Sequence, residues 1–147
     1  MYVYSFKDLS GAFIHPLVPI PLVFSGSIGV KSITVKMAGE KTHQDIAADG
    51  AIQSSYIPGD NGSVSIVCQQ NSQTHQQLLI WYNLVKAAAD LGNVSAFALG
   101  AMTLRSISAQ TGHVITGISI PKLGDKPYGA QGADVTWDLP AASIQSI

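Results

Sequence analysis

The chain has 147 residues, of which 12% are charged and 46% are hydrophobic, and its formal net charge is −1. This length fits one domain over residues 1–147, and the near-neutral charge excludes the basic surface with which proteins bind nucleic-acid phosphates tightly. Roughly 25% of residues are charged in a typical soluble domain, so an unusually large part of this surface must be uncharged. Because such surfaces usually mark contacts between proteins, we expect a subunit that packs against other subunits.

Targeting and membrane segments are not predicted. The single Cys68 excludes a disulfide within the chain and fits a reducing cytoplasm. The first residues lack the basic and apolar regions of a secretory signal. The apolar run at about 12–24 contains three prolines and is shorter than the ~20 residues of a membrane span. We predict that this run is an extended arm or loop lying against protein, with contacts between subunits made by Ile14, Leu17, Val18 and Ile20.

Several short segments alternate apolar and polar residues and are separated by turn signals, which is the pattern of an antiparallel β protein. Strands are predicted at about 31–37, 42–47, 51–57, 63–70, 96–106, 113–120 and 134–139.

The first two predicted strands are expected to pair as a hairpin over about 31–47. This hairpin is a second extension that would reach neighbouring subunits, and its candidate contact residues are Lys36, Glu40 and Lys41. The following Asp49-Gly50 pair predicts another hairpin turn, because glycine readily accepts the positive φ that such turns need.

The apolar spacing becomes helical at about 72–91. Asn71 or Ser72 is expected to cap the start of this helix, and Gly92 stands where a helix commonly ends. The stripe predicted to cover the core consists of Leu78, Trp81, Tyr82 and Val85. Strands that outnumber helices in this way predict a mainly β fold, an antiparallel sandwich or barrel of about seven strands with one flanking helix.

Four acidic residues are candidates for a surface that lines a channel, namely Asp45, Asp49, Asp134 and Asp138. The last two alternate with apolar residues and must face away from the core. A lining without Lys or Arg would let DNA pass without sticking, because contacts to phosphates are what strengthen binding. The alternative interpretation is a set of ordinary solvated carboxylates.

Catalytic and metal-binding patterns are missing from the sequence. The four histidines have no zinc-ligand spacing, and Cys68 has no CxxC partner. Cys68 lies on the apolar side of its predicted strand, so we interpret it as a core residue and not as a nucleophile. We therefore predict no catalytic residue, no metal site and no cofactor.

Segments distributed along nearly the whole chain carry a resemblance. They are Tyr4–Asp8 with Ser10–Ala12, Asp45–Gly50, Gly59–Gly62, Gln69–Ser72 with Trp81–Asn83, and Asp125–Tyr128 before Val135–Trp137. In this order they resemble the tail tube proteins of contractile-tailed phages and prophages. The resemblance implies a tail-tube-like fold, rings of six subunits, and stacked rings that form a tube inside a contractile sheath.

The same resemblance implies partners and a location. The partners are further copies of the chain and the sheath, baseplate and tape-measure proteins, with transient passage of DNA and no membrane. The location is the virion tail, assembled in the host cytoplasm. A terminator, sheath, baseplate or tailocin protein is a variant of this interpretation. A small-ligand β-barrel and a hydrolase on a β scaffold remain as alternatives, and they would require an apolar cavity and a polar catalytic cluster, respectively.

Overall fold

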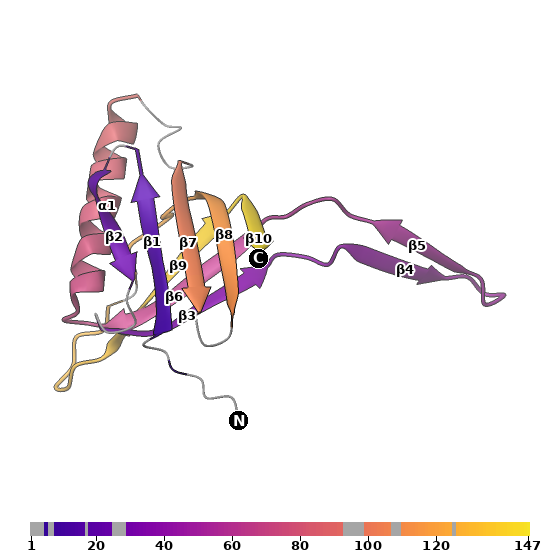
Figure 1. Ribbon diagram of the computed structural model, residues 1–147, viewed down its shortest axis with the longest axis horizontal. Coiled ribbons are helices and arrows are strands. Elements are labelled where there is room, and N and C mark those ends of the chain that lie inside the picture. Colours follow the sequence, from indigo (N-terminus) through magenta and orange to yellow (C-terminus); the bar gives the residue numbers. More distant parts are fainter. Residues whose placement is uncertain are drawn as a thin grey trace.

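The computed structural model describes residue 5 and residues 8–16, 18–24, 29–92, 99–106, 110–124 and 126–147. Within these residues the chain forms ten strands and one helix (Figure 1). In chain order they are β1 (Leu9–His15), β2 (Val18–Phe24), β3 (Val30–Met37), β4 (Thr42–Ile46), β5 (Ile52–Tyr56), β6 (Gly62–Gln69), α1 (Gln73–Asp90), β7 (Gly100–Ser106), β8 (Thr111–Ile118), β9 (Asp134–Ala141) and β10 (Ser143–Ser146).

The strands form three antiparallel sheets. Five strands make a sheet in the order β10-β8-β7-β1-β2, and three make a sheet in the order β3-β6-β9. These two sheets pack as a sandwich, and α1 lies along one side of it next to β2 (Figure 1). β4 and β5 form a separate two-stranded sheet that projects from the sandwich. The predicted mainly β fold with one flanking helix is confirmed, and β3 to β9 correspond to the seven predicted strands.

Alternation along β6 and β9 supplies one side of the core. Val64 and Ile66 of β6 are completely buried, and the ladder places them opposite Leu139 and Trp137 of β9, which are buried as well. The facing sheet contributes large buried side chains such as Ile115. Burying each such side chain stabilises the fold by about 1.5–3 kcal/mol, so this apolar layer is the main favourable contribution.

The helix α1 has defined ends and covers the side of the sandwich. The Ser72 side chain accepts a hydrogen bond from the backbone N–H of His75 at 3.2 Å, and the helix ends before Gly92, whose φ is +104°. Leu78, Trp81 and Val85 are buried, and Tyr82 is half-buried against the core. No helix in the described part of the chain is both long and apolar enough to cross a membrane.

The segment at 12–24 does not form an arm, so this prediction is wrong. Residues 12–15 belong to β1 and residues 18–24 form β2. These two strands pair with each other, and β1 also pairs with β7. Phe13 and Leu22 lie opposite each other and are buried in the core. β2 is the outermost strand of its sheet, where the missing N–H groups of Pro19 and Pro21 are tolerated.

The hairpin predicted over 31–47 is also wrong, because β3 and β4 do not pair with each other. β3 pairs with β6, and β4 pairs with β5. Backbone hydrogen bonds from Ala38 to Asn61 and from Ile57 to Lys41 join the segments between these two ladders. β3–β4 and β5–β6 are therefore the two sides of one long ribbon, and the β4–β5 hairpin is its far end.

A hydrogen bond joins α1 to β9 inside the core. The Nε1–H of Trp137 donates to Nδ1 of His75 at 3.1 Å, and both side chains are almost completely buried. Nδ1 accepts only while it carries no proton, so the contact requires a neutral imidazole. Burial lowers the pKa of His75, and the nearby positive charge of Lys126 lowers it further. His75 therefore supports the fold in its uncharged form.

The free energy of unfolding should decrease as the pH falls below about 6.5, the ordinary pKa of histidine. Because folding lowers the pKa of His75, the unfolded chain takes up the proton first, and acid then favours unfolding. We expect the urea midpoint of the wild type to fall between about pH 7.5 and pH 5.5. The His75→Gln variant should lose part of this decrease, whereas His43→Gln on exposed β4 should retain it. Identical pH profiles for wild type and His75→Gln would contradict the assignment.

Trp81 should be a large contributor to subunit stability. It is 2% exposed, and its ring stacks on Phe13 with centroids 4.4 Å apart. We expect Trp81→Ala to reduce the free energy of unfolding by about 3–5 kcal/mol, measured by urea titration at concentrations where the chain is monomeric. Ile80→Ala on the same helix is the control, because Ile80 is 55% exposed and should cost about 0.5 kcal/mol or less.

Candidate assembly surfaces

The β4–β5 hairpin is exposed along its entire length (Figure 1). One of its faces carries Ile46 and Ile52, which lie opposite each other and are 68% and 63% exposed, and Tyr56, which is 72% exposed; the polar pair Gln44 and Ser54 lies between them on this face. The other face is polar and has the pair Asp45 and Gln53. An isolated two-stranded hairpin is marginally stable in water at best, so this element gains stability from any surface that covers its apolar side.

Local contacts fix both ends of the hairpin. At the tip, Gly50 has a φ of +88°, and the Asp49 carboxylate accepts a backbone hydrogen bond at 3.0 Å. At the base, Lys41 forms an ion pair with Asp60 and lies 5.9 Å from the centre of the Tyr56 ring. Lys41, a sequence candidate for contacts between subunits, thus makes its described contacts within the subunit.

The outward side of β3, β6 and β9 is a polar face. Its edges carry opposite charges, because lysines stand on β3 and aspartates on β9, with Ser and Thr between them. Lys31 pairs with Asp134 at 3.0 Å, whereas Lys36 and Asp138 have no ion-pair partner among the described residues. The strand residues of this polar face are Lys31, Ser32, Thr34, Lys36, Ser63, Ser65, Val67, Gln69, Asp134, Thr136, Asp138 and Pro140.

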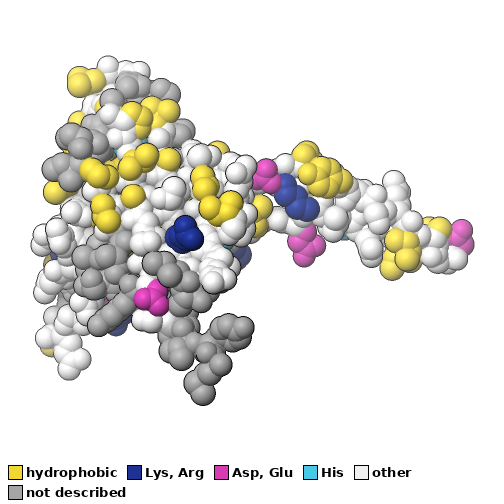
Figure 2. Space-filling view, viewed as in Figure 1, with side chains coloured by type: hydrophobic (Ala, Val, Ile, Leu, Met, Phe, Trp, Pro, Cys, Tyr) yellow, Lys and Arg dark blue, Asp and Glu magenta, His cyan; other side chains and the backbone are white. Residues whose placement is uncertain are grey.

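The outward side of the five-stranded sheet is a second surface, which we call the neutral face. Figure 2 shows hydrophobic side chains gathered over this side and few charged ones. A depression of about 90 Å³ lies in it, lined by Ala12, Ile14, Ala101, Met102 and Thr103. The strand residues of the neutral face are Ser10, Ala12, Ile14, Val23, Ala101, Thr103, Arg105, Val114, Thr116, Ser143 and Gln145.

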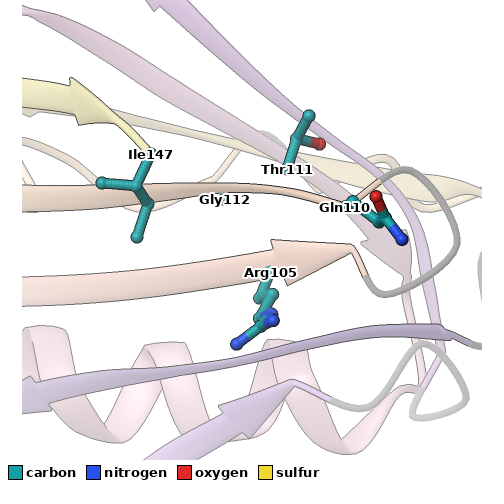
Figure 3. A pocket seen from close by; sticks show the side chains of 5 residues that line it. All are labelled: Arg105, Gln110, Thr111, Gly112 and Ile147. Carbon is teal, nitrogen blue, oxygen red and sulfur yellow. The ribbon is translucent and has the colours of Figure 1, made fainter.

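Arg105 is the charged residue of that set, and it lines a hollow at one end of the neutral face. The hollow has a volume of about 250 Å³, and its other lining residues come from the ends of neighbouring strands (Figure 3). Ser10 and Gly112 flank Arg105 across the two ladders and are uncharged. Arg105 forms no ion pair within the described residues, so its guanidinium has donors available for an acidic group.

The helix contributes a third exposed apolar strip. Ile80 and Leu84 lie one turn apart and are 55% and 43% exposed, and Leu91 at the end of the helix is 90% exposed. Exposed apolar strips of this kind often mark contacts with other proteins.

The sequence candidates for subunit contacts are placed on separate elements. Ile14 is 53% exposed on the neutral face. Lys36 and Glu40 are exposed at the end of β3 and in the following loop. Leu17 and the side chains of Val18 and Ile20 lie outside the part of the chain that the structure describes.

The four candidate aspartates do not form one acidic surface. Asp45 and Asp49 belong to the projecting hairpin, whereas Asp134 and Asp138 stand on the polar face. Sequence reasoning also did not identify Arg105. The available signal was the alternation along β7, which turns Arg105 outward together with uncharged neighbours while Met102 and Leu104 are buried.

Catalytic chemistry is not indicated by the groups that the structure places in the core. Burial raises the pKa of the Cys68 thiol, which disfavours the thiolate that a nucleophile or metal ligand requires. No group of three or more His, Cys, Asp or Glu side chains in the described ranges is arranged to hold a metal ion.

Comparison with solved structures shows a shared fold. A chain of the structure entitled "Cryo-EM Structure of an Extracellular Contractile Injection System, PVC sheath-tube complex in extended state" matches with a TM-score of 0.62 and 11% identity, covering 99% of this chain and 92% of that chain. Chains of the anti-feeding prophage match with a TM-score of 0.59 and 9% identity. The chain from the sixfold-symmetrised baseplate covers 96% of this chain and 93% of that chain. The chain from the tube-terminating cap covers 100% and 92%.

Comparison with curated proteins gave no match. The family model described as "Bacteriophage PhiTE tail tube protein" matches residues 1–147. Tail tube proteins are structural components of the phage tail and not enzymes. The chain belongs to the bacteriophage PhiTE tail tube protein family.

Proposed function

We propose that this chain is the tube subunit of a contractile phage tail and that copies of it form stacked rings, six subunits to a ring, around a conduit for DNA. The observation that carries the proposal is the exposed β4–β5 hairpin, whose apolar face is uncovered in the single chain. Membership in a tail tube family supplies the context in which such a hairpin meets further copies.

Several observations support the ring and its partners. One structure with the same fold is a baseplate described as sixfold symmetrised, and another is a sheath–tube complex. These neighbours support a ring of six and contacts with sheath and baseplate proteins, and a tape-measure protein would occupy the tube during assembly. A terminator or baseplate role is the nearest alternative, since a cap and a baseplate chain share the fold.

The polar face is our candidate for the wall of the conduit. It carries two aspartates and two lysines: Lys31 is held in an ion pair with Asp134, and Lys36 is the one lysine of this face without an ion-pair partner among the described residues. The Ser and Thr side chains between the charged edges offer hydrogen bonds but no net attraction to phosphates. Such a wall would let DNA move through the tube, because binding strength grows with the number of Lys and Arg contacts to phosphates.

The apolar side of the hairpin should be required for assembly. We expect the double variant Ile46→Ser/Ile52→Ser to remain monomeric at concentrations where the wild type forms rings or tubes, because it removes the paired exposed aliphatic side chains. Light scattering over a range of concentrations and negative-stain electron microscopy would measure this. Thermal unfolding of the monomer should change little, since the hairpin lies outside the core.

The matched control is Asp45→Ser/Gln53→Ser, which alters the directly paired residues on the other side of the hairpin. This control should assemble like the wild type. Normal tubes from the Ile46→Ser/Ile52→Ser protein would show that assembly does not use the hairpin.

Assembled wild-type tubes should bind double-stranded DNA weakly even at low salt. Replacing Thr136 on the polar face with Lys adds one positive charge to each copy and should strengthen binding, with a steeper dependence on salt. Gln76→Lys adds the same charge on the exposed side of α1 and should have a smaller effect. DNA binding would be measured by co-sedimentation. Equal binding by the two lysine variants would show that the polar face does not form the wall of the conduit.

A further inference from the structure

Two unpaired charges of opposite sign lie beside two apolar patches on different parts of the subunit. Asp49 stands at the tip of the hairpin, next to the exposed pair Ile46 and Ile52. Arg105 stands at one end of the neutral face, beyond the depression lined by Ile14 and other residues. Neither charge forms an ion pair within the described residues. The acidic hairpin tip and the basic hollow are thus complementary in charge, and each lies beside exposed apolar side chains.

We propose that the hairpin of one copy docks on the neutral face of another copy. In this contact Ile46 and Ile52 cover the depression beside Ile14, and the Asp49 carboxylate pairs with the Arg105 guanidinium. The contact rests on the proposed function, which requires copies to associate, and it adds the receiving surface and the charge pair that orients the hairpin.

The distance between the charged residue and the apolar patch is similar on the hairpin and on the neutral face. Along β7, Ala101 in the depression and Arg105 are four residues apart, which is about 13 Å in a strand. On the hairpin, Asp49 follows Ile46 by three residues, which span at most about 10 Å. The length of the arginine side chain closes the remaining difference. The tip of the hairpin therefore reaches the hollow when its aliphatic pair covers the depression.

Charge favours this face over the polar face as the receiver. Arg105 is the one charged residue among the described strand residues of the neutral face, and the nearest acid along the chain is Asp8, just before β1. The polar face carries an unpaired charge of each sign, Lys36 and Asp138, in addition to the Lys31–Asp134 pair, so an acidic tip would meet repulsion there as well as attraction. The hairpin does not reach its own neutral face, since it projects away from the sandwich (Figure 1). The partner in this contact is therefore a second copy of the chain.

Charge exchange tests the pair. Arg105→Glu and Asp49→Lys should each raise the concentration required for assembly about tenfold or more, because each replaces attraction by repulsion. The double variant Asp49→Lys/Arg105→Glu restores opposite charges and should assemble within about threefold of the wild type. Asp45→Lys makes the same change on the opposite side of the hairpin and is the control, with little expected effect.

Chemical cross-linking tests the contact without depending on the charges. In the variant Ile52→Cys/Ala101→Cys, a short bifunctional maleimide should join copies into a ladder of multimers on a denaturing gel. The native Cys68 is fully buried with a raised pKa and should not react in the folded chain. The control variant Gln53→Cys/Ala101→Cys places the hairpin thiol on the other side and should give few multimers.

The outcomes separate the contact from the proposed function. A wild type that stays monomeric at every concentration, together with no cross-linking, overturns both. A wild type that assembles, while the charge exchange gives no rescue and the two cysteine pairs cross-link equally, overturns this contact and leaves the proposed function intact. Rescue by charge exchange, together with selective cross-linking of the Ile52→Cys/Ala101→Cys variant, establishes the contact between the hairpin and the neutral face.

Discussion

The antiparallel ladder between β3 and β6 is the constraint on which the rest of the subunit depends. Its inner residues, such as Ile66, belong to the core, and β6 is also the central strand between β3 and β9. The same two strands continue past the sandwich edge into the β4–β5 hairpin. The direction of the hairpin is therefore set by the best-packed layer of the protein, although the hairpin itself has no core of its own.

Ion pairs contribute little to holding this subunit together. The three among the described residues, Lys31–Asp134, Lys41–Asp60 and Lys86–Asp90, have side chains 36–68% exposed, and such pairs are each worth about 0–1 kcal/mol. Specificity in the core comes instead from directional contacts of the aromatic side chains. The stacking of Trp81 on Phe13 and the hydrogen bond from Trp137 to His75 place α1 on the sandwich at two separate points.

The sequence predicted those elements whose own side-chain pattern shows which face is buried. The sequence predictions were wrong where the structure of a segment depends on which other strand it pairs with. Strict alternation identified β9, and a helical stripe with a Ser72 cap identified α1. The three prolines at 12–24 argued against a membrane-spanning helix and indicated an extended segment. An edge strand tolerates such prolines, and edge positions are known only once the sheet is assembled. The 31–47 hairpin failed for a similar reason, because β6, far along the chain, was the true partner of β3. β10 was missed because it has only four residues.

In the proposed contact the hairpin of each copy occupies a different surface on the next copy, so the association is head-to-tail, and rings stacked through it remain open along the tube axis. An assembly built this way has two chemically distinct ends, one displaying uncovered hairpins and the other displaying vacant receiving faces. The rate of growth then differs between the two ends. A protein that stops growth at one end must bind hairpins, and a protein that stops it at the other end must bind receiving faces.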